Sequence, residues 1–205
     1  MFRLFQHIID FIFPPSAEEL KIRSIDGAWL LKNAEKARKA EFSFINPIFS
    51  YQESLIKELI WQIKYKKNMH AIRCAGYVLY CELNKNYKEA RLIPIPISKN
   101  RRRERGYNQC ELIINEIIRL DSEKKFLADF ELLIREKDIE KQTHKNRSER
   151  ISNIKHIFKV TKRNNLDRKI IIIDDVTTTG STLKEARDEL LKVGYTDVSA
   201  LSIAH

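Results

Sequence analysis

Residues 170–182 read IIIIDDVTTTGST and combine two adjacent acids with a cluster of small hydroxyl side chains. The acids, Asp174 and Asp175, follow four consecutive isoleucines. The hydroxyl residues flank Gly180, and they are Thr177, Thr178, Thr179, Ser181 and Thr182. Polar residues of these types at the end of a buried strand predict a binding site for an anionic ligand rich in hydroxyl groups.

The hydroxyl side chains and Gly180 are suited to hold a phosphate group. Glycine lets the backbone turn closely, and the amides at the start of a following helix point outward, where an anion is stabilised. Carboxylates repel a phosphate, so Asp174 and Asp175 are expected to accept hydrogen bonds from a ribose diol or to lie near a bound Mg²⁺. A phosphate and a diol together indicate a ribose 5-phosphate.

A purely structural explanation is that the acids cap the helix and the threonines satisfy the backbone of the turn. One cap accounts for one aspartate, but not for a second acid and five hydroxyl side chains. The P-loop pattern GxxxxGK[ST] and a strand-linked GxGxxG are absent from the sequence, which argues against nucleoside triphosphates and dinucleotides. The ligand-binding interpretation is therefore preferred.

A second charged cluster follows the β-branched run RLIPIPI at residues 91–97. The segment is predicted to be a loop, and its cations are Lys99, Arg101, Arg102, Arg103 and Arg105. Arginine matches pairs of phosphate oxygens, so the loop suits a pyrophosphate or a nucleic-acid backbone equally well; the alternative is a solvated surface loop. Tyr107 is the only aromatic residue near it in the sequence, which offers little support for base stacking.

In the C-terminal half, the strands and helices that must position these residues are predicted to alternate. Strands are predicted at 91–97, 130–136, 156–160, 168–174 and 196–204, and helices at 108–120 and 181–193. This order is typical of an α/β domain with a mostly parallel sheet, in which ligands bind beyond the carboxyl ends of the strands. The polar segment 137–153 is long and nearly free of apolar residues, as expected of a lid.

The N-terminal half is less regular. Apolar spacing predicts two successive helices from Tyr51 onward, whereas residues 34–41 are predicted to be helical and residues 26–31 extended. The first 15 residues are expected to form a short amphipathic helix docked on the domain, because the run is too short and interrupted to cross a bilayer and lacks a cleavage site for secretion.

Composition sets broad limits on the class of protein. The 205 residues, 43% hydrophobic and 32% charged, fit one globular domain with a leading appendage, and the net charge of +10 is compatible with an anionic partner. Cys74, Cys81 and Cys110 have no CxxC spacing, which predicts buried thiols in a reducing cytosol and neither a zinc site nor disulfides.

The hydrophobic run, the two acids and TTGST resemble the phosphoribosyl pyrophosphate (PRPP) signature of type I phosphoribosyltransferases. The resemblance implies their fold, a mostly parallel sheet flanked by helices with a flexible hood, here residues 137–153. It implies PRPP binding by the acids and by residues 177–182, with Mg²⁺ carried by PRPP and not by side chains alone. The hood residues expected to take part in catalysis are Gln142, Arg147 and Arg150, with His144 a weaker candidate.

A narrower resemblance is to the ComF family. RLIPIPISKNRRRERGYNQCELI is similar to that family's "PVP...RxRGFNQ" segment, and the resemblance covers about residues 50 to 205. The spaced pattern of the family is matched by Arg135, Gln142, Arg150, Asn153 and Phe158, and a family Lys-Tyr pair by Lys64 and Tyr65. We therefore expect a phosphoribosyltransferase-like domain at 51–205 and an appendage at 1–50.

The sequence departs from relatives at two places. Phe13-Pro14-Pro15 is followed by Ser16, and no cysteine precedes Cys74, so the zinc ribbon of many ComF members is not implied and no zinc is expected. Purine salvage relatives often carry an acid at the position of Thr178, whereas relatives that act on orotate resemble this chain there. The motif therefore offers no general base for a purine.

The resemblance implies a ComF-like protein of natural transformation that binds PRPP with Mg²⁺ and single-stranded DNA. Its expected location is the cytoplasm, or the periphery of the inner membrane, with proteins of the competence machinery as partners and no transmembrane segment. Two alternatives stay open. One is a salvage phosphoribosyltransferase that transfers ribose 5-phosphate to a nitrogen acceptor, and the other is a PRPP-sensing regulator without turnover.

Overall fold

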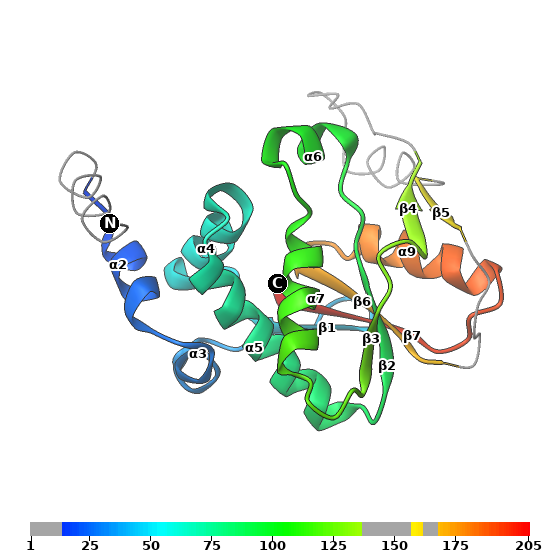
Figure 1. Ribbon diagram of the computed structural model, residues 1–205, viewed down its shortest axis with the longest axis horizontal. Helices are drawn as coiled ribbons and strands as arrows, with labels where there is room; N and C mark the ends of the chain where they lie inside the picture. Colours follow the sequence, from blue (N-terminus) through cyan, green and yellow to red (C-terminus); the bar gives the residue numbers. More distant parts are fainter. Residues whose placement is uncertain (1–13, 137–156, 162–167) are drawn as a thin grey trace.

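A computed structural model of the chain describes residues 14–136, 157–161 and 168–205 (Figure 1). A parallel five-stranded sheet forms its centre, with the order β1-β7-β6-β2-β3. The strands are β1 (Ile45–Phe49), β2 (Ala90–Pro94), β3 (Phe126–Ala128), β6 (Ile170–Val176) and β7 (Val198–Ala204). The α/β class with a parallel, helix-flanked sheet, predicted from the sequence, is confirmed.

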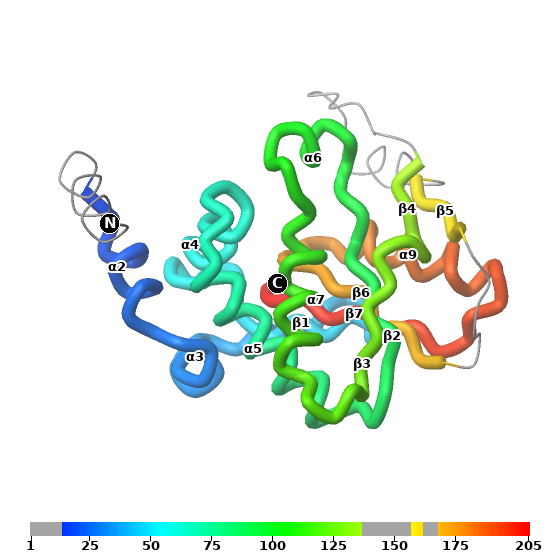
Figure 2. The backbone as a smooth tube through the Cα atoms, in the orientation of Figure 1, coloured from blue at the N-terminus to red at the C-terminus, as the bar shows by residue number. Residues whose placement is uncertain are grey.

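Helices pack against this sheet, and others lie to one side of it (Figures 1 and 2). They are α2 (Ala17–Ser24), α3 (Gly27–Asn33), α4 (Ser54–Trp61), the π-helical turn η1 (Gln62–Lys66), α5 (Met69–Asn86), α6 (Lys99–Arg105), α7 (Gln109–Leu120) and α9 (Ser181–Lys192). The apolar stripe predicted from Tyr51 onward is buried along α4 and η1, at Leu55, Leu59 and Ile63. Both helices predicted in the C-terminal half are confirmed at α7 and α9.

The four isoleucines of β6 supply both faces of the sheet. Ile171 and Ile173 belong to the core formed with α4, α5 and α7, whereas Ile170 and Ile172 belong to the core formed with α9. Successive side chains of a strand point to opposite faces, so an unbroken apolar run is what a strand covered on both sides requires. The same alternation sends the two acids that follow in opposite directions.

Two predictions for the N-terminal half are wrong. Residues 26–31 are not extended but begin α3, where the Asp26 side chain caps the helix by accepting the amide of Trp29 at 2.8 Å. Residues 34–41 are not helical: Lys36 forms an isolated bridge with Phe49, and the amide of Ala37 donates to the carbonyl of Ile48 at 2.9 Å. Pairing with β1 outweighs the local helix propensity.

The basic segment after β2 is also different from its prediction, because it is the short helix α6 and not a loop. Ser98 caps its start by accepting the amide of Arg101 at 3.2 Å, and Gly106 ends it with a φ of 78°. A side-chain cap at the start and a left-handed glycine at the end are sufficient local signals for a helix. The five cations therefore spread around a helix instead of lining one side of a loop.

Two further parts of the chain form sheet pairings that the sequence did not predict. Residues 45–49, within the stretch expected to be an appendage, form the edge strand β1 and pair with β7 from Ile45 opposite Ala200 to Phe49 opposite Ala204. The strands predicted near 130–136 and 156–160 are β4 (Leu133–Arg135) and β5 (Phe158–Val160), which pair with each other in a separate antiparallel sheet.

Cysteine burial follows its prediction for Cys74 and Cys110, which are buried, whereas Cys81 is only half-buried. Within the described ranges, none of the helices has the length and apolar character needed to cross a membrane. The amphipathic helix expected at the extreme N-terminus falls almost entirely outside the residues described.

Candidate functional site

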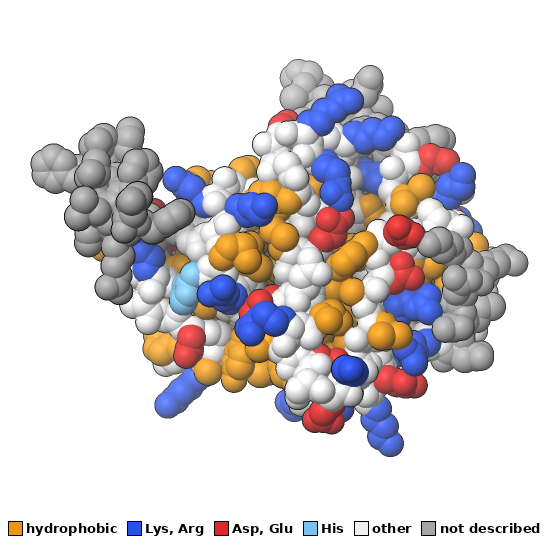
Figure 3. All heavy atoms as spheres, in the orientation of Figure 1, with side chains coloured by type: hydrophobic (Ala, Val, Ile, Leu, Met, Phe, Trp, Pro, Cys, Tyr) orange, Lys and Arg blue, Asp and Glu red, His pale blue; other side chains and the backbone are white. Residues whose placement is uncertain are grey.

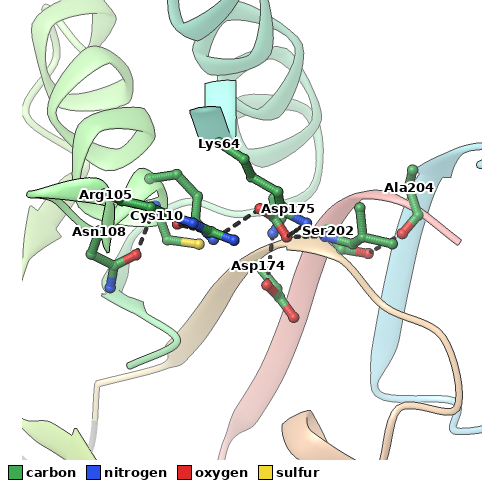
Figure 4. Close-up of polar contacts among 10 residues, drawn as sticks. Lys64, Arg105, Asn108, Cys110, Asp174, Asp175, Ser202 and Ala204 are labelled. Atoms are coloured by element: carbon green, nitrogen blue, oxygen red, sulfur yellow. Dashed lines mark hydrogen bonds and ion pairs between the residues drawn. The ribbon is translucent and has the colours of Figure 1, made fainter. Parts of the chain in front are cut away.

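The acid pair lies within β6, near its carboxyl end, because the strand continues to Val176, two residues beyond its predicted end. β6 has β7 on one side and β2 on the other, so the pair occupies the middle of the carboxyl edge of the sheet. This is the edge at which parallel α/β sheets bind ligands. Figure 4 shows the two carboxylates pointing in different directions, as the strand alternation requires.

Asp175 is held on both of its carboxylate oxygens. Its Oδ1 lies 3.1 Å from Nζ of Lys64 in η1, and its Oδ2 accepts a hydrogen bond from Nε2 of Gln109 at 2.9 Å. The amide of Val176 adds a further hydrogen bond to Oδ1 at 2.7 Å. Asp175 is therefore a buried carboxylate whose orientation is fixed by two other elements before any ligand arrives.

The residues that hold Asp175 belong to a connected group. Gln109, itself buried, accepts a hydrogen bond from Nη1 of Arg105 at 2.9 Å. Asn108 caps α7 by accepting the amide of Cys110 at 3.0 Å, and its Nδ2 donates to the carbonyl of Ile95 at 3.0 Å. These bonds fix the RGYNQ turn between α6 and α7 against the end of β2, and so place Gln109 opposite the acid.

Asp174 has a different environment. Its Oδ1 accepts the amide of Asp175 at 2.8 Å, whereas its other oxygen has no hydrogen-bond partner among the described residues. Burial, and then the negative charge of Asp175, raise the pKa of Asp174 to about 8, although the charges of Lys64 and Arg101 act in the opposite direction. Burial thus favours the protonated form of this carboxyl, and Asp174 is the member of the pair with an oxygen free to contact a ligand.

The turn after β6 is anchored at its start and open at its tip. Thr177 is buried, its amide donates to the carbonyl of Ala204 at 3.0 Å, and its own carbonyl accepts from Nδ1 of His205 at 3.1 Å. Thr178 and Thr179 are exposed, and Ser181 is half-buried. The hydroxyls of Thr179 and Ser181 lie 2.8 Å apart, so they form one cluster of hydroxyl groups.

Gly180 is required by both conformation and space. Its φ is 72°, and a Cβ at this position would come within 2.7 Å of Cδ1 of Ile45 and 2.8 Å of Cδ2 of Phe42. α9 starts immediately after it, at Ser181, without a side-chain cap. Because the first amides of a helix have no intrahelical acceptor, the start of α9 presents donors beside the hydroxyl cluster, together with the half-buried Thr182.

The cations of α6 have separate roles. The charge of Arg101 acts on Asp174, and Arg105 contacts Gln109, so both are connected to the acid pair. Arg102 instead pairs with Glu111 at 2.6 Å. Arg103 and Lys99 are exposed on the helix surface. The five residues predicted as one phosphate-binding set therefore divide between the acid pair and the outer surface.

Two residues of the site were not identified as site residues from the sequence, and these are Lys64 and Gln109. Lys64 belongs to the Lys-Tyr pair and Gln109 to the RGYNQ turn, and both segments carry the family resemblance. The sequence therefore singled out these segments but did not indicate which residues they contact. The catalytic candidates Gln142, Arg147 and Arg150, and also His144, lie outside the described residues. Within the described ranges, no cluster of three or more His, Cys, Asp or Glu side chains could hold a metal ion.

Comparisons with known proteins identify relatives of the chain. No family model matches it. It is 29% identical to competence protein ComFC of Streptococcus pneumoniae over 76% of this chain and 66% of that protein. It is 33% identical to ComFC of Bacillus subtilis over 72% of this chain and 58% of that protein, and 28% identical to competence protein F of Haemophilus influenzae over 71% and 66%. These homologues confirm the resemblance to the ComF family.

The chain spans only about three fifths to two thirds of the length of these curated relatives. Among solved structures, it is similar to a hypoxanthine phosphoribosyltransferase from Staphylococcus aureus, with a TM-score of 0.41 and 16% identity over 64% of this chain and 61% of that one. It is also similar to a purine phosphoribosyltransferase from Pyrococcus horikoshii, with a TM-score of 0.40 and 16% identity over 64% and 71%.

Proposed function

We propose that the chain binds PRPP together with Mg²⁺ at the carboxyl end of β6, and that it acts as a ComF-like protein in DNA uptake. The observation that carries the proposal is the meeting of a buried acid pair with an open turn of hydroxyls and amides on the central strand. A ribose 5-phosphate offers a diol to the first and a phosphate to the second.

The phosphate half of this site is the turn from Thr178 to Thr182. Among the described residues, the hydroxyls of Thr179 and Ser181 bond to each other, and the amide of Ser181 at the start of α9 donates to Oγ1 of Thr179 over a long 3.4 Å. A phosphate dianion would satisfy several of them at once, and the helix dipole favours a negative charge at this position. Gly180 gives the turn the left-handed backbone that it needs and lets it pack closely against Ile45 and Phe42.

The diol half is Asp174, supported by Asp175. Asp174 has a carboxylate oxygen that no described residue engages, and its ionised form would accept hydrogen bonds from the two ribose hydroxyls. Since its pKa lies near 8, ligand binding at neutral pH would release a proton. Asp175 would act indirectly, because Lys64 and Gln109 already occupy both of its oxygens.

The acid pair fits Mg²⁺ that arrives with PRPP better than a resident metal. Mg²⁺ prefers several oxygen ligands in an octahedron, and here only Asp174 has a carboxylate oxygen that is not already engaged by described residues. The bound metal would neutralise charge on the pyrophosphate. Arg101 of α6, whose charge reaches Asp174, would favour the same anionic group.

The DNA half of the proposal rests on homology and charge. The relatives named above are competence proteins, the chain carries a net charge of +10, and Arg103 of α6 is exposed without an ion pair among the described residues. Exposed arginines of this kind bind nucleic-acid phosphates irrespective of base sequence. We place the protein in the cytoplasm, where it would meet incoming single strands and other proteins of the competence machinery.

Equilibrium dialysis with labelled PRPP tests the ligand assignment. Binding should require Mg²⁺, should be abolished by a chelator, and should be competed by ribose 5-phosphate, which carries both the phosphate and the diol. Competition by inorganic pyrophosphate alone, with ribose 5-phosphate inert, would show that the ligand is recognised elsewhere. Separately, anisotropy of a labelled single strand should report binding that weakens steeply with salt. Binding indifferent to salt would rule out the DNA role.

A further inference from the structure

Two exposed aromatic rings lie next to each other, and one of them contacts the basic helix α6, which is far from both in the sequence. Trp61 ends α4 and is 42% exposed, and Tyr65 lies in η1 and is 62% exposed. Their ring centroids are 6.0 Å apart with an interplanar angle of 44°. Large aromatic side chains are seldom left this exposed as neighbours unless a partner covers them.

A positively charged side chain also lies over each ring. Nζ of Lys66 lies 5.4 Å from the centroid of Trp61, and the guanidinium of Arg105 lies 5.2 Å from the centroid of Tyr65. We call these four residues, Trp61, Tyr65, Lys66 and Arg105, the stacking strip. It brings flat apolar faces and positive charges together within one short surface, which is the combination that binds single-stranded nucleic acid.

The stacking strip is joined to the candidate PRPP site by covalent neighbours and hydrogen bonds. Tyr65 follows Lys64, which pairs with Asp175, and Arg105 donates to Gln109, which contacts the same acid. Figure 4 shows Lys64 and Arg105 approaching the acid pair from two different elements. A strand lying along the stacking strip would therefore pass next to the carboxyl edge of the sheet.

The surrounding charge favours a polyanion. Figure 3 shows lysine and arginine side chains gathered on the part of the molecule where α6 lies. Arg102 and Arg103 lie on the exposed surface of that helix, where they can follow a phosphate backbone whose bases reach the rings. Cations set among the rings make the surface a poor match for an apolar protein interface, whose centre is depleted of charge.

Tyr107, the aromatic residue nearest in sequence, has a structural role instead. Its hydroxyl donates to the carbonyl of Ile63 at 2.7 Å, and Nζ of Lys67 lies 5.3 Å from its ring centroid. It fastens the RGYNQ turn to η1. The sequence-based expectation considered Tyr107 alone, whereas the two exposed rings come from another segment of the chain.

We propose that Trp61 and Tyr65 are a base-stacking platform for single-stranded DNA, with Lys66 and Arg105 holding the rings and the flanking phosphates. The inference rests on the proposed DNA-binding function and adds to it which residues contact the bases. It separates two contributions: α6 supplies salt-dependent attraction to the backbone, and the stacking strip supplies affinity that depends on the presence of bases.

The test compares two labelled oligonucleotides of equal length, one of thymidines and one of abasic sites, by anisotropy with the full chain. The wild type should bind the thymidine strand about tenfold or more tightly than the abasic strand. Trp61→Ala with Tyr65→Ala should remove most of this preference and keep the salt dependence. The matched variant Arg102→Gln with Arg103→Gln should reduce the salt dependence and keep the preference.

The outcomes distinguish this inference from the function on which it rests. If the wild type binds neither strand, the proposed DNA role fails and the platform fails with it. If it binds both strands equally, or if the aromatic double variant keeps the preference, the platform is wrong while the DNA role stands. Capture of a protein partner by the strip in the absence of DNA binding would also overturn it.

A second measurement needs no change in the stacking strip. The chain has two tryptophans, so Trp29→Phe leaves Trp61 as the only one. Thymidine strands should quench its fluorescence at saturation, whereas abasic strands should leave it nearly unchanged. Equal quenching by both strands, or no quenching by either despite binding, would contradict stacking on Trp61.

Discussion

The two halves of the motif at residues 174–182 are adjacent in sequence and opposite in character. The acid half is buried, and Asp175 is bound by Lys64 and Gln109 from two other elements. The hydroxyl half is a turn with exposed tips, followed by a helix that lacks a side-chain cap. In the acid half the protein engages both oxygens of Asp175 but only one oxygen of Asp174, whereas the hydroxyls of the turn bond mainly to each other.

This difference separates residues that shape the site from residues that bind. A buried charge with fixed partners contributes to stability, and removing a partner leaves the charge without compensation. An exposed hydroxyl contributes little to stability, and its loss affects the ligand. Substitutions in the acid half should therefore change unfolding and binding together, whereas those in the tip of the turn should change binding alone.

The largest effect on stability is expected for Lys64→Met. It leaves Asp175 buried without its cation, and because Lys64 is itself 21% exposed the cost should be about 2–3 kcal/mol of unfolding free energy. Urea unfolding measures it, with Lys85→Met as the control, because Lys85 is exposed on α5. Equal stability of the two variants would show that the acid half does not depend on this ion pair.

Gly180→Ala should cost about 1–3 kcal/mol, because a Cβ there is strained by a φ of 72° and contacts Ile45 and Phe42. Gly106→Ala is a matched control: its φ is 78°, but no atom lies within 4 Å of the added Cβ. Thermal unfolding should therefore show a larger loss at Gly180. PRPP affinity should fall only for the Gly180 variant, and a similar fall for both would remove the steric argument.

Asp174→Asn should stabilise the protein, and more so as the pH rises. Asp174 keeps its proton up to a pKa of about 8 in the folded chain but ionises near pH 4 when unfolded, so the folded state binds the extra proton between these values. Stability of the wild type should thus fall across this window relative to the variant. The gain should be complete above pH 8 and should appear as a higher Tm of the variant.

Scans at pH 4 and pH 8.5 measure this difference. The two proteins should have nearly the same Tm at the lower pH and separate at the higher one. A constant difference across the range, or a variant that loses stability as the pH rises, would contradict a buried protonated carboxyl at position 174.

The smallest effect on stability is expected for Thr179→Ala, at the tip of the turn. Unfolding free energy should change by less than about 0.5 kcal/mol, because the side chain is exposed. PRPP affinity should nevertheless fall about tenfold, since a hydrogen bond to a charged phosphate is lost. Thr196→Ala, exposed and remote from the turn, serves as the control. A loss of stability without a loss of affinity would reverse the assignment of the two halves.

Sequence patterns predicted the parts of the molecule that depend on local periodicity. The isoleucines of β6, the amphipathic α7 and α9, and the position of the turn at a strand end all follow from period and from glycine placement. The acids and the hydroxyl cluster were predicted together for the same reason, because they are contiguous.

Contacts between distant segments could not be predicted in this way. Lys64 and Gln109 reach Asp175 from positions more than 60 residues away, and Tyr65 meets Arg105 of α6, with η1 bonded to the RGYNQ turn through Tyr107. The residues after α3 pair with β1 and do not form the helix that their local sequence favours. In each case tertiary contact decides the outcome, and a single sequence carries no direct signal of it.

Calorimetric titration of Mg²⁺ and PRPP into the wild type and into Asp174→Asn with Asp175→Asn tests the central claim most directly. The wild type should bind one PRPP per chain and release about one proton at neutral pH, seen as a dependence of the heat on buffer ionisation. The double variant should remain folded and show no binding. An unchanged dissociation constant in the folded double variant would refute the assignment of the site.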